Sequence, residues 1–168
     1  MLTEVITKER LKIFYAHACY IKKLAIELEA FKANYNSLKG SNFAETKVMT
    51  GSKKLSPEEL YLLCLESKSK KLERFTKFVE EERPIIAAQI QRLTNPDYKN
   101  ILEDRYLDLK DWKIIALEYF GSEKDFWLYR ETKYHFIVMT WHKRAVEALE
   151  EISKKPYIQA NTQLYLEV

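Results

Sequence analysis

The chain is poor in the residues that interrupt helices. Its 168 residues include only three glycines and four prolines. So few breakers among many Leu, Lys, Glu and Ala residues favour long helices over a sheet protein. The composition therefore predicts an all-α fold.

Long hydrophobic runs and recognisable cysteine motifs are missing as well. No apolar run approaches the roughly 20 residues that cross a bilayer, and the first eight residues lack the basic lead and apolar centre of a signal peptide. We therefore expect a cytoplasmic protein. The two cysteines, Cys19 and Cys64, match no ligand or redox spacing, and we expect both to be reduced packing residues.

Motifs of catalysis are absent from the sequence too. It contains no phosphate-binding glycine loop, nucleophile elbow, HExxH or paired CxxC. His135 and His142 are seven residues apart, and a metal site would need further ligands. We expect no enzyme activity, no cofactor and no metal site.

Charge is present in both signs and is unevenly distributed. The formal net charge is +3. Residues 1–56 hold ten Lys and Arg against five Asp and Glu, whereas residues 97–168 hold eleven against thirteen. Within 126–146, however, four cations face one carboxylate, and only the charges that meet a DNA backbone determine affinity. The charge pattern permits DNA binding without requiring it.

The first 94 residues predict a long antiparallel helical hairpin. Between Leu11 and Leu28, apolar residues alternate spacings of three and four, which is a heptad seam, and the seam slips by a three-residue step before Phe31. Residues 40–56 resemble a surface loop. Ser56, Pro57 and Glu59 then form a strong helix start with a capping box.

Residues 95–155 predict a second, helix-turn-helix-like module, followed by a tail at 156–168. Asn95 and Pro96 begin a helix that we expect to continue to Leu107. We expect Asp108 to cap the next helix. A final helix of up to 30 residues follows the turn and stops before Pro156.

The corner of this module depends on a few positions. Trp112 begins the apolar side of the helix before the turn, and Ala116 is small enough for a close helix crossing. Gly121 supplies the tolerance of positive φ that we expect the corner to need. Five residues separate Ala116 from Gly121, one more than is usual, so the predicted turn is long. An ordinary corner of a helical bundle is the alternative.

The final helix has two faces when its residues are placed at 100° intervals. Tyr134, Val138 and Trp141 share the core side with Ala145, Leu149 and Ile152. The candidate DNA-binding residues lie on or beside an adjacent arc, with Thr140 as a base contact and the cations contacting phosphates or guanine edges. They are Arg130, Lys133, Thr140, Lys143 and Arg144.

Two segments carry a resemblance to a known group. The run from Leu102 to Ala116, with its Arg105-Tyr106 pair and Trp112, and the closing Ala148-Leu149 resemble region four of sigma factors. More specifically, the chain is similar to the ArpU-like late transcriptional regulators of phages and prophages of Gram-positive bacteria, over most of residues 7–152. The resemblance implies promoter DNA binding, activation of late phage genes and contact with RNA polymerase.

The leading hypothesis is therefore a phage-type transcriptional regulator that binds double-stranded DNA. The alternative is a non-enzymatic protein-interaction adaptor or anti-repressor that acts through its helix faces, since the final helix is apolar on several sides. A homodimer fits either hypothesis, because the seam from Leu11 to Leu28 allows pairing within or between chains.

Overall fold

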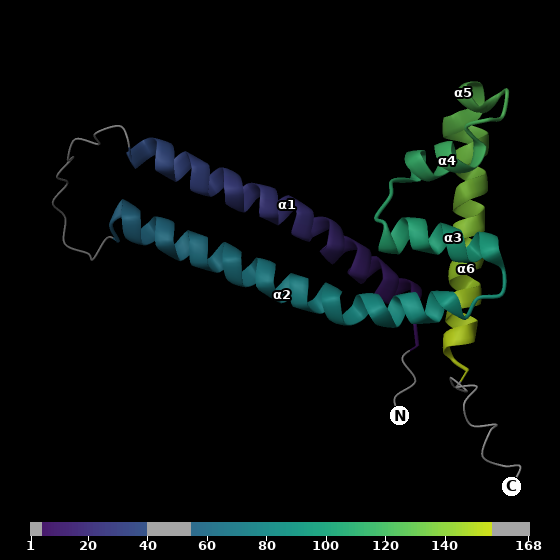
Figure 1. Cartoon of the computed structure of the whole chain (residues 1–168), viewed down its shortest axis with the longest axis horizontal. Coiled ribbons are helices and arrows are strands. Elements are labelled where there is room, and N and C mark those ends of the chain that lie inside the picture. The colour runs from purple at the N-terminus through teal and green to yellow at the C-terminus, as the bar shows by residue number, and fades with distance from the viewer. Residues whose placement is uncertain (1–4, 40–54, 156–168) are drawn as a thin grey trace, which may run out of the picture. The chain divides into compact units, whose positions relative to one another are not determined.

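The structure is a computed structural model that describes residues 5–39 and 55–155, with the backbone alone at 36–39. Every regular element among these residues is helical, so the all-α prediction is confirmed (Figure 1). Most of the predicted 40–56 loop and the predicted 156–168 tail lie outside the described residues. No helix in the described part is long and apolar enough to cross a membrane. The elements are α1 (Lys8–Lys39), α2 (Pro57–Gln91), α3 (Pro96–Leu102), η1 (Glu103–Leu107), α4 (Trp112–Phe120), α5 (Phe126–Tyr129), η2 (Arg130–Tyr134) and α6 (His135–Ser153).

The contacts divide the chain into two compact units. Unit 2 is Ala16–Glu80, and unit 1 holds the described residues up to Tyr15 and from Glu81 onward. The division falls at a different place from the expected boundary between residues 94 and 95, because the first residues of α1 and the last turns of α2 belong with the C-terminal helices. Pro84, inside α2, removes the backbone donor that would bond to the carbonyl of Glu80.

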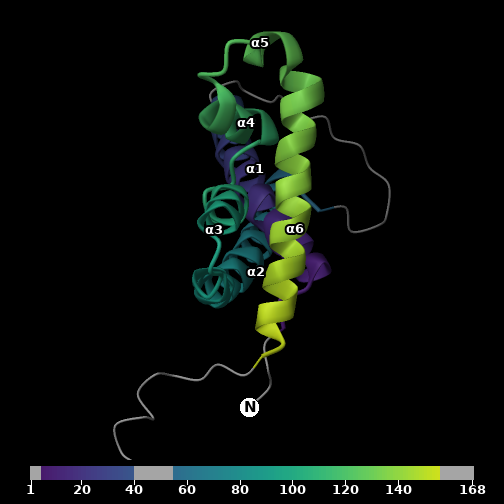
Figure 2. The ribbon, with the colours of Figure 1, turned by 90° about the vertical axis from the view of Figure 1, so that its right-hand side faces the viewer.

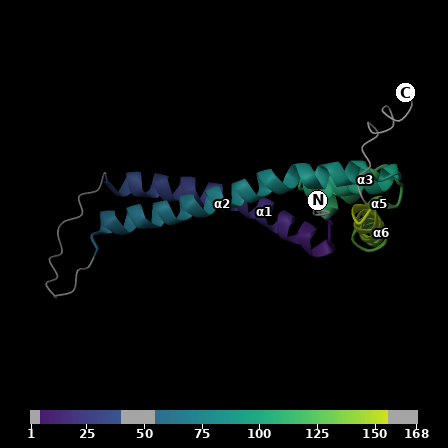
Figure 3. The same ribbon diagram turned by 90° about the horizontal axis from the view of Figure 1, so that it is seen from below.

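Unit 2 is an antiparallel pair made by most of α1 and the first two thirds of α2, which lie side by side in two views (Figures 1 and 3). Its contacts run in opposite directions along the two helices. Tyr20 meets the Phe75 ring at 5.4 Å, and further along α1 Phe31 stacks on Tyr61 at 5.0 Å. The predicted hairpin is therefore present in unit 2.

The slip in the α1 seam occurs two helical turns earlier than expected, before Leu24 rather than before Phe31. Leu24 is almost fully buried, whereas Ala25 is only half-buried. The three-residue step therefore runs from Ile21 to Leu24. The reason is size, since leucine can cover more apolar surface at this step than alanine.

Cys64 is exposed, so its expected packing role is wrong, while Cys19 is half-buried.

Unit 1 places α6 beside α3 and α4 (Figures 1 and 2). Its core takes apolar side chains from every long element of the unit, and these side chains are almost fully buried. They include Leu11, Phe14, Ile86, Ile90, Ile101, Leu102, Ile115, Val138 and Leu149. At the foot of α6, the buried Ser153 hydroxyl accepts a hydrogen bond from the Ile6 amide at 3.0 Å.

A charged residue interrupts the apolar seam of α2 at Glu82, and an ion pair accounts for it. Arg10 Nε lies 2.7 Å from Glu82 Oε2, and Arg10 Nη2 lies 2.9 Å from Oε1. The two side chains are only 24% and 17% exposed. Such a two-point contact between α1 and α2 is stronger than an ordinary surface pair. Glu82 is therefore not part of a solvated acidic face.

Two predicted helix starts are confirmed by their hydrogen bonds. Ser56 and Glu59 form the reciprocal capping box, with distances of 2.7 and 3.1 Å. Asn95 Oδ1 accepts from the amides of Asp97 and Tyr98. The helix after Asn95 reaches Leu107 as expected, but its last five residues, η1, have the wider π-helical turn.

The predicted cap of the next helix is wrong. Asp108 is the residue after η1, and the N-cap of α4 is Asp111, which directly precedes Trp112 and has an extended backbone. Between them Leu109 has φ 57, the left-handed region that a leucine rarely adopts. This reversal delays the start of α4 by three residues, so Asp108 cannot reach its first turn.

Candidate nucleic-acid interface

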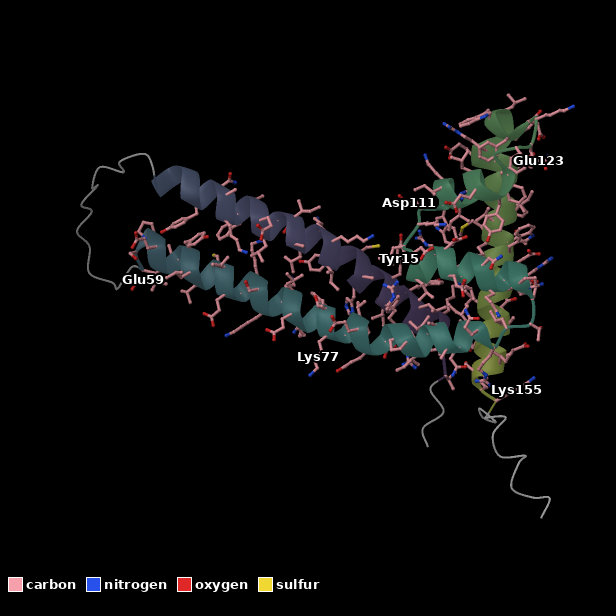
Figure 4. The ribbon with its side chains drawn as sticks, in the orientation of Figure 1. Tyr15, Glu59, Lys77, Asp111, Glu123 and Lys155 are labelled. Atoms are coloured by element: carbon pink, nitrogen blue, oxygen red, sulfur yellow. The ribbon has the colours of Figure 1, made fainter. Side chains whose placement is uncertain are left out.

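The sequence predicts DNA contact in the region made by α4 and by the elements after it, α5, η2 and α6. Asp111 precedes α4 and Glu123 lies in the turn after it (Figure 4). Ala116 is 3% exposed, and α4 contacts both η2 and α6. Trp112 is half-buried, with its ring 4.8 Å from that of His142 on α6.

Gly121 is needed in the turn for a reason other than the expected one. Its φ of −60° is an ordinary right-handed value, so the prediction of positive φ is wrong. A Cβ at this position would lie 2.4 Å from the carbonyl oxygen of Leu117, closer than real contacts allow. The same carbonyl accepts the Gly121 amide at 2.8 Å. The constraint on residue 121 is therefore steric.

Two of the predicted cations have acidic partners. Lys133 Nζ lies 2.8 Å from Asp125, which also accepts a short hydrogen bond from Tyr134. These two hydrogen bonds lower the pKa of the Asp125 carboxyl group. The hydrogen bond between Lys133 and Asp125 also raises the pKa of Lys133. Arg130 Nε lies 3.6 Å from Glu131. Carboxylates of the chain itself therefore already compensate much of the positive charge of η2.

The other two cations, Lys143 and Arg144, are exposed on α6, and neither has an ion pair with a described residue. At 100° per residue they point away from the buried side of α6, which carries Val138 and Leu149. Thr140 is near the same outward face. Its hydroxyl donates to the Phe136 carbonyl at 2.8 Å but keeps lone pairs that can accept.

The π-helical segment η2 separates these residues into two groups. Arg130 and Lys133 lie within it, while Thr140, Lys143 and Arg144 follow it in regular α-helix. A π turn holds more residues than an α turn, so Arg130 is rotated away from the position that an uninterrupted helix would give it. The outward face of α6 brings Thr140, Lys143 and Arg144 together, and Arg130 is not part of that group.

Sequence reasoning did not predict how much apolar surface this region exposes. Leu128, Phe136 and Trp127 are 75%, 71% and 66% exposed. A cavity of about 280 Å³ lies between α4 and the segment formed by α5 and η2. Its lining includes Ile114, Ala116 and Trp127. The signal was visible in the sequence, since Leu128 and Phe136 fall on neither the core side nor the charged side of the predicted helix.

No group of three or more His, Cys, Asp or Glu side chains that could hold a metal ion occurs among the described residues. His135 borders the 280 Å³ cavity, and His142 is bonded to Tyr106.

Comparison with models of protein families, with curated proteins and with solved structures gives no match to this chain.

Proposed function

We propose that this chain is a transcriptional regulator of the phage or prophage type that binds double-stranded DNA. The contact surface is the outward face of α6, with α4 and the turn at Gly121 behind it. The proposal depends chiefly on Lys143 and Arg144. These two residues are adjacent and exposed, and neither has an acidic partner among the described residues. Such cations are free to neutralise phosphates, and Thr140 beside them can contact a base edge.

Charge compensation sets the expected strength of this binding. Lys133 is paired with Asp125, and Arg130 lies close to Glu131. A cation that must leave a carboxylate before it meets a phosphate contributes less than an unpaired one. We therefore expect Lys143 and Arg144 to contribute more than Lys133 and Arg130.

The test is a titration of a fluorescently labelled mixed-sequence duplex at several salt concentrations. Each phosphate contact contributes about −0.9 to the slope of log affinity against log salt. Replacing both Lys143 and Arg144 by alanine should make the slope less negative by about two such contributions. The matched control replaces Lys77 and Lys22 by alanine, because both are exposed lysines of unit 2. Salt-independent binding, or equal loss in the control, contradicts the proposal.

A second function, a protein-interaction adaptor or anti-repressor, is favoured by the exposed apolar residues. Leu128 and Phe136 are mostly exposed, and exposed apolar side chains that gather into a patch commonly mark protein-interaction sites. This function predicts that Leu128→Ser with Phe136→Ser removes a complex with RNA polymerase or with a second copy of the chain and leaves DNA affinity unchanged. Co-purification with the polymerase and light scattering measure the two complexes. If neither complex forms with the unchanged protein, this second function is wrong.

A further inference from the structure

A second cavity, of about 200 Å³, lies inside unit 1 where the start of α1 meets η1, α4 and α6. Its lining includes the cationic side chains of Lys8, Lys12 and Arg105 and the rings of Trp112 and His142, and it includes no carboxylate. This composition differs from the rest of the region, where the predicted cations Arg130 and Lys133 lie beside Glu131 and Asp125.

The two lysines are placed where they oppose helix stability. They are four residues apart on α1, so their like charges lie on neighbouring turns. Lys8 is also the first residue of α1, where the helix dipole disfavours a cation. Both side chains are exposed, and neither has an ion pair with a described residue. A bound anion would relieve both unfavourable interactions.

Arg105 is held rigidly at the same cavity. Its guanidinium lies 3.8 Å from the centre of the Tyr15 ring and 4.2 Å from that of Trp112. Its Nη1 donates to the Lys110 carbonyl at 2.8 Å, which leaves its other N–H groups without a carboxylate in the described part of the chain. A guanidinium fixed between two rings loses little entropy when it binds an oxyanion.

The electrostatic potential at the cavity is positive, because its lining holds three cations and no carboxylate. His142, in its wall, is hydrogen-bonded to Tyr106 at 2.9 Å. Burial first, and then the charges of Arg105 and Lys8, lower the pKa of His142 to about 4. The imidazole is therefore neutral near pH 7, and the charge at the cavity comes from the two lysines and Arg105.

We propose that this cavity binds a phosphate group, carried either by a free phosphate ester or by a nucleic-acid backbone. Three cations, one of them a planar guanidinium, match the charge and oxygen geometry of phosphate. The volume is below the range of roughly 300–1,000 Å³ usual for organic ligands, so the site fits the phosphate group rather than a whole nucleotide. This site is distinct from the Lys143 and Arg144 face and does not depend on it.

The test uses the full chain and inorganic phosphate, with sodium chloride at equal ionic strength as the reference. Calorimetric titration and the melting temperature are measured for the unchanged protein and for Lys8→Gln with Lys12→Gln. The matched control is Lys77→Gln with Lys124→Gln, which removes the same charge from exposed positions that do not line the cavity. Lys12→Gln alone is a milder variant for the case in which the double substitution disturbs folding.

We expect phosphate to bind the unchanged protein and the control, and the dissociation constant to rise about tenfold or more in the cavity variant, as loss of charge-assisted bonds implies. Equal binding by all variants, or no phosphate binding by the unchanged protein, overturns the proposal. A DNA titration of the same variants then separates the sources. If the cavity variant loses DNA affinity and phosphate competes with DNA, the ligand is backbone phosphate. If DNA affinity is unchanged, it is a free phosphate ester.

Discussion

The hydroxyl of Tyr106 lies 2.9 Å from Nε2 of His142, and this hydrogen bond joins η1 to α6. Both residues are largely buried, and burial raises the pKa of Tyr106 to about 12 while it lowers that of His142 to about 4. Both side chains are therefore neutral near pH 7, and the hydrogen bond connects two uncharged groups of unit 1.

The first prediction concerns acid stability. The ordinary pKa of His142 is 6.5 and its folded value is about 4. Because the unfolded chain takes up the proton first, the contribution of neutral His142 is complete above about pH 6.5 and is lost as the pH falls towards 4. The loss is at most about 3 kcal/mol. Urea unfolding at pH 7 and pH 4.5 measures it.

The matched variant is His142→Gln, which can still bond to Tyr106 but does not titrate. Its stability should fall less between the two pH values than that of the unchanged protein. Equal losses would show that other groups, such as the carboxylates, account for the whole effect.

The second prediction concerns the turn after α4. Gly121→Ala should destabilise the protein by about 1–3 kcal/mol, because the new methyl group meets the Leu117 carbonyl oxygen. At a glycine with ordinary φ and free space, the same change would stabilise by about 0.4–1 kcal/mol. The sign of the change in unfolding free energy therefore decides between these cases, with Ser122→Ala, at the next and exposed residue, as the control.

The third prediction concerns the ion pair between α1 and α2. Glu82→Gln should cost about 1.5–3 kcal/mol, since it replaces a charged two-point contact with Arg10 by a neutral one. Glu81→Gln, at the exposed neighbouring residue, should change the unfolding free energy by less than about 0.5 kcal/mol. Denaturant titrations of both variants make the comparison. Equal effects would show that the contact does not stabilise unit 1.

The fourth prediction tests the position of the seam slip in α1. Leu24→Ala removes a side chain that is almost fully buried and should cost about 2–5 kcal/mol. Ile26→Ala removes a mostly exposed one from the same turn and should cost far less. If the two substitutions cost the same in thermal unfolding, Leu24 is not the core residue at this step.

The sequence predicted those features that depend on neighbouring residues. The caps at Ser56 and Asn95 and the heptad seam of α1 are local patterns, and the helices follow them. The unusual backbone of Leu109 has no such signal, because leucine normally avoids left-handed φ and only the surrounding fold holds it there. The start of α4 was misplaced for that reason.

The candidate site was less predictable because its properties depend on partners that lie outside the face on which the spacing places its residues. The spacing of Lys133 on the final helix does not reveal that Asp125, eight residues earlier, would neutralise it. The convergence of Lys8 with Arg105 likewise requires α1 to pack against η1 within unit 1. Residue spacing assigns side chains to the faces of one helix, whereas ion pairs depend on how the side chains turn and cavities arise between helices.

The π-helical turn from Arg130 to Tyr134 also makes the last helix sensitive to length. Such a turn holds one residue more than the α-helical ladder requires. Deletion of a single residue there would return the segment to regular α-helix and rotate Phe126 and Trp127 by about 100° relative to α6. Phe126, now buried, would leave the core. The shortened chain would thus have a more regular last helix but would lose the packing of Phe126 beside α4.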